Sequence, residues 1–220
     1  MNKDAGFKTY ICAGALIWVA DELSAADRLD SLDALLYCQT VAAHKTAQFS
    51  DKQAWAHANK MAIKVTGAML VDNPNVSFPV SMPATFTLPE LVQRIMRPVM
   101  PLTMVDSQDS GWQVPADQAA AVLASELLQT HVVFQERWIR FMFSIVSPGV
   151  TITTAMISFE YDENIVSAVL EQRFSTEKIV GDLFVDAYKA FTETEDYDFS
   201  RATIISLLGA RRQEQVIALA

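Results

Sequence analysis

The stretch RFMFSIVSPGVTITTAMISFEY, from Arg140 to Tyr161, limits what this chain can fold into more than any other part. Between Phe141 and Phe159 it contains no Asp, Glu, Lys or Arg. A transmembrane helix needs about 20 such residues, so length alone would allow the run to cross a bilayer. However, Pro148 and Gly149 form a turn dipeptide near its middle, and the threonines that follow favour extended structure. The run is therefore predicted to be a β-hairpin with arms of roughly ten residues each.

One face of the first arm is wholly apolar, and the other face is half apolar. Two interpretations of such a hairpin stay open. It can form the centre of a sheet that helices cover on both faces. Alternatively, because about nine to eleven tilted residues also span a bilayer as β-structure, it can meet lipid once the covering helices move aside. The apolar face contains Ile139, Phe141, Phe143 and Ile145, and the mixed face contains Arg140, Met142, Ser144 and Val146.

Helical periodicity dominates the chain before the hairpin. Ser24 is a predicted N-cap, and Thr87 with Glu90 forms a predicted capping box at the start of a third helix that ends near Pro98. In the first helix Leu29, Leu32, Leu35 and Leu36 should share one face, with Asp27, Asp30 and Asp33 on the other. In the second, Trp55, Ala58, Ala62 and Val65 should share a face. The four predicted helices cover residues 24–47, 51–70, 87–97 and 115–129.

The remaining segments complete one predicted α+β domain over residues 1–220, an antiparallel sheet covered by layers of helices. Turn and loop residues mark 72–75 and 106–112. The acidic run Thr192–Phe199 is expected to be a solvated loop or a helix flank. The other assignments are Thr9–Ala20 as a strand or strand–helix junction, residues 76–86 as an edge strand or linker, Asn164–Ser175 as a strand, and Thr176–Phe191 as a helix.

Charge and cysteine content exclude several classes of partner. The net charge of −9 over 220 residues argues against nucleic acid and against electrostatic docking on an anionic membrane. Cys12 and Cys38 have no CxxC spacing, so they are expected to be two buried thiols, although a disulfide or lipid attachment stays open. Asp4 and the lack of an A-x-A site predict release of a soluble protein without a standard signal peptide.

No sequence motif for catalysis, cofactor binding or metal binding stands out. The chain has no G-x-S-x-G, no HExxH and no P-loop, so a non-enzymatic role without a cofactor is expected. His44, His57 and His131 are far apart in the sequence and have no metal-ligand spacing. Two alternatives stay open for the methionines near the third helix, which either fill the core or form an adaptable apolar surface. These are Met96, Met100 and Met104.

Two stretches of the chain resemble the Cyt-type cytolytic delta-endotoxins, which are insecticidal bacterial proteins. DKQAWAHANKMAIKVTGAML resembles the second helix of that family, and RFMFSIVSPGVTITTAMISFEY resembles its long strand pair. The order of the predicted elements also fits, but the acidic C-terminal part differs from the strand-rich ending of the family. The resemblance implies a sheet wrapped by helix layers and direct association with lipid without an enzymatic step.

The leading hypothesis is a cytolytic, pore-forming or otherwise membrane-perturbing toxin or virulence protein that acts at the membrane of a target cell. A homo-oligomer in the membrane is compatible with this hypothesis. The alternative is a soluble protein that holds a lipid or acyl chain between sheet and helices, and the third is an enzyme of unrecognised type. The residues expected to contact lipid are Trp138, Phe141, Phe143, Ile145, Val150, Ile152, Met156 and Ile157.

Overall fold

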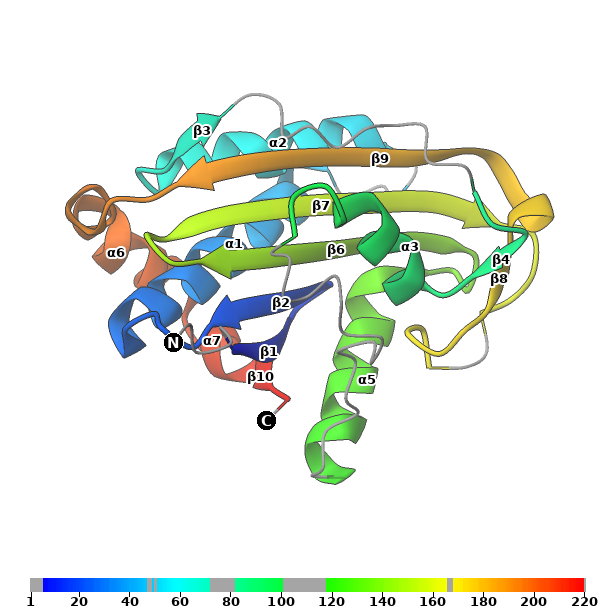
Figure 1. Ribbon diagram of the computed structural model, residues 1–220, viewed down its shortest axis with the longest axis horizontal. Coiled ribbons are helices and arrows are strands. Elements are labelled where there is room, and N and C mark those ends of the chain that lie inside the picture. The colour runs from blue at the N-terminus through cyan, green and yellow to red at the C-terminus, as the bar shows by residue number, and fades with distance from the viewer. Residues whose placement is uncertain are drawn as a thin grey trace.

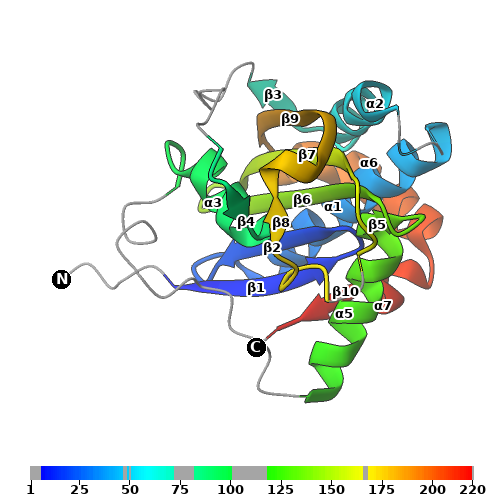
Figure 2. The ribbon, with the colours of Figure 1, turned by 90° about the vertical axis from the view of Figure 1, so that its right-hand side faces the viewer.

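A mostly antiparallel sheet lies between two layers of helices in the computed structural model of the protein (Figures 1 and 2). The structure describes residues 6–46, 49, 51–71, 82–100, 118–165 and 168–219. Every neighbouring strand pair in the main sheet is antiparallel except β2 with β6, which is parallel. In spatial order the strands are β10 (Val216–Ala218), β1 (Phe7–Cys12), β2 (Ala15–Ala20), β6 (Trp138–Ser147), β7 (Thr151–Tyr161), β9 (Ile179–Phe191) and β3 (Met69–Val71), with β5 (Val133–Phe134) paired to β6.

The predicted hairpin forms the middle of this sheet and is confirmed as β6 and β7. Its pairing runs without a break from Trp138 opposite Glu160 to Ser147 opposite Thr151. Gly149 takes a φ of 74° in the turn, a conformation that glycine adopts without steric cost. The N-terminal segment, predicted as a strand or strand–helix junction, forms the antiparallel pair β1 and β2.

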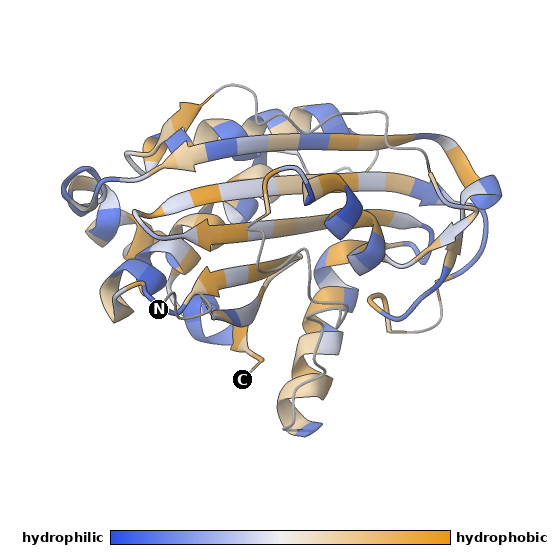
Figure 3. Ribbon diagram, in the orientation of Figure 1, coloured by the Kyte–Doolittle hydropathy of each residue, from blue (hydrophilic) through white to orange (hydrophobic). Residues whose placement is uncertain are grey.

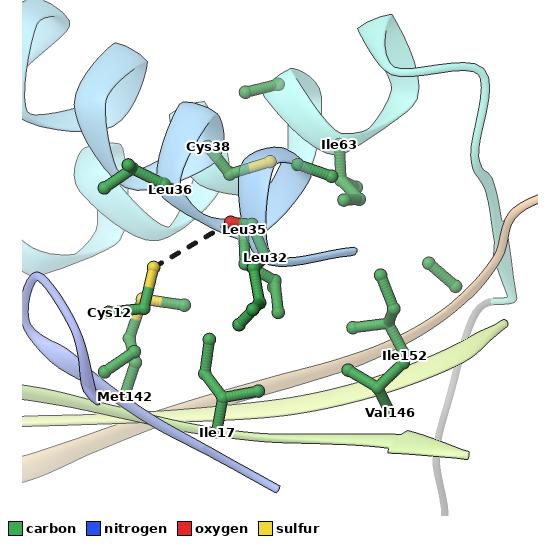
Figure 4. Packing of buried hydrophobic residues seen from close by; sticks show 14 of the residues in the cluster. Cys12, Ile17, Leu32, Leu35, Leu36, Cys38, Ile63, Met142, Val146 and Ile152 are labelled. Carbon is green, nitrogen blue, oxygen red and sulfur yellow. Dashed lines mark hydrogen bonds between the residues drawn. The ribbon is translucent and has the colours of Figure 1, made fainter. Parts of the chain in front are cut away.

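One helix layer consists of α1 (Ala25–Lys45), α2 (Lys52–Val65), α6 (Thr194–Leu208) and α7 (Arg211–Glu214). Ser24 caps α1 as predicted, because its hydroxyl accepts a hydrogen bond from the Asp27 backbone amide at 3.0 Å. Figure 4 shows Leu32 and Leu35 of this layer pointing toward side chains of the sheet, and Leu36 belongs to the same hydrophobic cluster. This layer and the sheet share one of the two hydrophobic clusters that the described residues form.

Three residues of these helices lie on the opposite side from the one predicted. Leu29 is 55% exposed and Val65 is 61% exposed, whereas Asp33 is only 4% exposed. Asp33 is buried because Arg212 of α7 donates to its carboxylate from Nε at 2.8 Å, and this contact joins residues far apart in the chain. Helical periodicity cannot show such a partner.

The other helix layer consists of α3 (Leu88–Met96), α5 (Gln118–Val132) and a small ribbon of β4 (Thr85–Phe86) and β8 (Phe174–Ser175). The capping box of Thr87 and Glu90 is confirmed, with both of its hydrogen bonds present. Met96 is buried and Met100 packs against the same cluster, so both act as core filling. Met104 lies outside the described residues, as do the predicted turn at 72–75 and the predicted loop at 106–112.

The helix predicted over Thr176–Phe191 is wrong, because the segment forms a 3₁₀ turn at Thr176–Lys178 followed by strand β9. The apolar residues of this segment fit both the helical period and the alternation of a strand. In the structure, one face of the strand packs toward α3 and the other toward α1, with Leu183, Val185 and Ala187 on the first and Phe184 and Tyr188 on the second. The long ladder with β7 decides in favour of the strand. The Gly181 φ of 71° is also incompatible with a regular helix at that position.

Two further assignments need correction. Within the described part of Asn164–Ser175, only Phe174–Ser175 is a strand, and Ile165 and Val169 are buried outside any strand. The second helix ends at Val65, and Met69–Val71 pairs with β9 instead of continuing it. The acidic run Thr192–Phe199 contains the first turns of α6, which agrees with a helix flank. Only Thr85–Phe86 is a strand in the described part of residues 76–86.

Candidate functional site

A cavity of about 500 Å³ lies where the turn between β1 and β2 approaches the C-terminal ends of α1 and α5. Its volume is within the range of about 300–1,000 Å³ that small-molecule sites occupy. Five elements contribute side chains, so residues from the whole length of the chain meet here. The lining residues are Ala13, Gly14, Gln39, Thr40, Ala43, His44, Phe49, Trp55, Thr130, His131, Arg140, Met142, Arg211 and Gln215.

Arg140 of β6 provides a buried positive charge in this cavity. Arg140 is only 5% exposed. The guanidinium carbon lies 4.0 Å from the centre of the Phe49 ring and 4.7 Å from that of Trp55, both within cation–π distance. Burial lowers the pKa of Arg140 to about 10, which leaves the guanidinium protonated at neutral pH.

The rim of the cavity adds further groups that carry or can take positive charge. His44 lies in the last turn of α1, His131 in the last turn of α5, and Arg211 at the start of α7. Partial burial lowers the pKa of His131 below its ordinary value. No Asp or Glu occurs among the described residues that line the cavity. Its fixed side-chain charge is therefore positive, although the net charge of the chain is −9.

Gln39 holds the turn that forms one wall of the cavity. Its side-chain oxygen accepts a hydrogen bond from the Gly14 amide at 3.0 Å, and its Nε2 donates to the Cys12 carbonyl at 2.9 Å. A Cβ atom on Gly14 would lie 3.2 Å from the His131 carbonyl oxygen, so a side chain there would push the turn away from α5. The neighbouring Ala13 takes a φ of 49°, which costs energy for any residue except glycine.

The hairpin residues expected to contact lipid do not gather at a single surface. Phe141, Phe143, Ile145 and Ile157 are buried under the α3 layer, and Ile152 and Met156 are buried under the α1 layer. Trp138 and Val150 are partly buried. The division of β6 into two faces is thus confirmed, and helices cover both faces.

The histidines and cysteines occupy different environments. His44 and His131, which are far apart in the sequence, line the same cavity, whereas the exposed His57 does not. Cys12 and Cys38 are both free and buried, as predicted. Burial raises the pKa of each thiol well above its ordinary value. Such thiols react slowly, which argues against lipid attachment at either position.

Arg140 is the functional candidate that the sequence pattern did not indicate. A single arginine in a strand otherwise free of charge was the available signal. The pattern could not show that Phe49, Trp55 and His131 would surround it, because these residues come from other elements.

The fold is thus a mixed α/β arrangement with a mostly antiparallel sheet, and one of its cavities is lined by cationic side chains. Comparison with protein-family models, with curated proteins and with solved structures gives no match. Across the described residues, no group of His, Cys, Asp and Glu is arranged to hold a metal ion. No helix in the described ranges combines the length and the apolar character needed to cross a membrane.

Proposed function

We propose that this protein binds a small anionic molecule in the cavity around Arg140, as a binding protein rather than an enzyme. One observation carries this proposal: the buried Arg140 guanidinium lines the same cavity as His44, His131 and Arg211, and no acidic side chain occurs among the described lining residues. An anion that enters this space gains charge-assisted hydrogen bonds in a region of low dielectric constant, where such bonds are strong.

The charge distribution also supports recognition of an anion over a neutral molecule. A buried charge is expensive unless the surroundings compensate for it, and the Phe49 and Trp55 rings supply part of that compensation. Ligand binding should stabilise the folded state by mass action.

The test is thermal unfolding with sodium benzoate and sodium phosphate, each compared with sodium chloride at equal ionic strength. The native chain should show a higher Tm with at least one of the two anions. Arg140→Met should abolish this response, and Arg173→Met should keep it, because Arg173 is exposed and pairs with Glu90 away from the cavity. Arg211→Ala, at the exposed rim, provides a second cavity variant that should fold and respond more weakly.

Two outcomes would overturn the proposal. In the first outcome, neither anion raises the Tm of the native chain. In the second, Arg140→Met and Arg211→Ala respond to the anions as strongly as Arg173→Met does. Either result would mean that the cationic cavity does not select anions.

A second candidate function is membrane perturbation by a toxin or virulence protein that is released in water-soluble form and acts at a target-cell membrane. The observation that favours it is α5, which Figure 3 shows with apolar colours along most of its length. Val122 is 52% exposed and Leu123 is 56% exposed on this helix. The resemblance of the hairpin to the Cyt-type cytolytic family supports the same candidate, with insertion of the hairpin as a later step.

Dye release from vesicles tests this second candidate, with neutral and anionic lipids in parallel. Leakage by the native chain should fall in the double variant Val122→Ser with Leu123→Ser. Leu207→Ser is the matched control, because Leu207 is 58% exposed on α6, away from α5. Absence of leakage from both kinds of vesicle would reject membrane perturbation.

A further inference from the structure

We infer that anion binding in this cavity is coupled to proton uptake by His44 and His131, so that the affinity for the anion rises as the pH falls through the mildly acidic range. This inference rests on the proposed anion-binding function and adds the regulation of the same site by pH. Three features carry it: two histidines line one cavity, neither has a competing partner among the described residues, and the described lining contains no carboxylate.

The first feature is the meeting of two histidines from helices that are distant in the sequence. His44 lies in the last turn of α1, His131 lies in the last turn of α5, and both line the cavity. Histidine has an ordinary pKa of about 6.5, so its charge can change close to neutral pH. The C-terminal end of a helix favours a nearby positive charge. Both helices therefore favour the protonated form of their histidine.

The second feature is that both imidazoles are available to a ligand. Within the part of the chain that the structure describes, no hydrogen bond or ion pair joins the side chain of His44 or His131 to another residue. Asp and Glu are absent from the described lining of the cavity. A protonated histidine would therefore find no carboxylate among the described lining residues, and an anion from solution can supply the opposite charge.

The third feature is the set of charged groups around the two histidines. β6 contributes Arg140 to the cavity and α7 contributes Arg211, while the turn between β1 and β2 contributes the uncharged Ala13 and Gly14. Both guanidinium groups stay protonated from pH 8 to pH 6. The histidines are thus the lining groups whose charge changes over this range. Other titratable residues on these and neighbouring elements do not line the cavity, among them Lys8, Tyr10, Cys12, Lys45, Asp51, Lys52, Glu126, Arg212 and Glu214.

Burial makes the proton uptake of His131 depend on the ligand. Partial burial lowers the pKa of His131 below its ordinary value, because the charged form loses hydration. A negative charge in the same cavity favours the charged form, so the pKa is higher in the complex than in the free protein. Linkage then fixes the direction of the effect. The affinity rises as the pH falls from the pKa in the complex to the lower pKa of the free protein, and it levels off below that.

Isothermal titration calorimetry with sodium benzoate and sodium sulfate, at pH 8 and pH 6 and at constant ionic strength, tests this inference. Neither anion takes up a proton between these two pH values. The native chain should bind at least one of them about fivefold or more tightly at pH 6. Titrations at pH 6 in two buffers of different ionisation enthalpy should show net proton uptake. The double variant His44→Gln with His131→Gln should lose both effects, and His57→Gln, at an exposed position outside the cavity, should keep them.

The outcomes separate the inference from the function on which it rests. If Arg211→Ala weakens binding but the native chain binds equally at both pH values without proton uptake, the proton coupling is overturned and the anion-binding function stands. The same holds if the double variant keeps the pH dependence. If neither anion binds at either pH, both are overturned. Should the double variant fail to fold, His44→Gln alone, at an exposed position, should lower the proton uptake, and unchanged uptake would overturn the coupling.

Discussion

At the residue scale, Gln39 shows how a single side chain shapes the cavity. We predict that Gln39→Leu lowers the free energy of unfolding by roughly 2–4 kcal/mol, because the Gly14 amide and the Cys12 carbonyl both lose a buried hydrogen bond. Chemical denaturation measures this loss. Gln213→Leu, at an exposed position of α7, should change it by no more than about 0.5 kcal/mol. Equal effects of the two variants would contradict a clamping role for Gln39.

His131 should make stability depend on pH in the mildly acidic range. Burial lowers its folded-state pKa, so the unfolded chain binds the proton more readily. Its contribution is therefore fully present above the unfolded value of about 6.5 and is lost as the pH falls below that value toward the folded pKa. The charged groups that line the same cavity are Arg140 and Arg211.

The measurement is the denaturation midpoint of the native chain and of His131→Gln between about pH 8 and pH 5. The native chain should lose more stability over this range than His131→Gln does. The exposed His57 on α2 provides the control, and His57→Gln should follow the native curve. Parallel curves for the native chain and His131→Gln would show that His131 does not contribute to the pH dependence of stability.

Some residue environments could be read from the sequence and others could not. The alternation in β6 placed Arg140 on the less apolar face, and the structure agrees. The aromatic rings at the guanidinium come from distant elements, which no local pattern contains. Asp33 was wrongly placed for the same reason, because its partner Arg212 is far along the chain.

At the element scale, segments with two agreeing local signals were predicted correctly. The hairpin combined alternation with Pro148-Gly149, and α3 combined periodicity with the capping box of Thr87 and Glu90. The apolar residues of β9 fit the period of a helix as well as that of a strand. Its pairing with β7 makes the segment a strand, and this pairing is a long-range contact that local sequence does not contain. The cavity was missed as a site because it forms only where several elements meet.

The packing of α1 against the sheet yields a prediction with a control on the same helix. Leu35 is fully buried, so Leu35→Ala should lower the free energy of unfolding by roughly 2–5 kcal/mol. Leu29 is 55% exposed, and Leu29→Ala should cost no more than about 0.5 kcal/mol. Denaturant midpoints of the two variants measure the difference. Similar midpoints would show that the Leu35 face of α1 is not part of the core.

At the scale of the whole molecule, both faces of the hairpin are covered, so the second candidate function requires opening. Phe141 and Phe143 lie under one helix layer, and Ile152 and Met156 lie under the other. Ligand binding in the cavity has no such requirement. The two candidate functions therefore differ in whether a helix layer must separate from the sheet.

A disulfide between α2 and β7 distinguishes these two mechanisms. Ala56 and Met156 line the same small cavity between helix and sheet, so Ala56→Cys with Met156→Cys places one thiol on each element, in a chain that also carries Cys12→Ser and Cys38→Ser. If activity needs the layers to separate, the oxidised protein should not release dye from vesicles and the reduced protein should, because the bond fixes α2 to the sheet. Mass spectrometry verifies the bond, and Ala56→Cys alone is the control. Equal leakage in both states would reject opening, and silence of every form, the native chain included, would favour the anion-binding function.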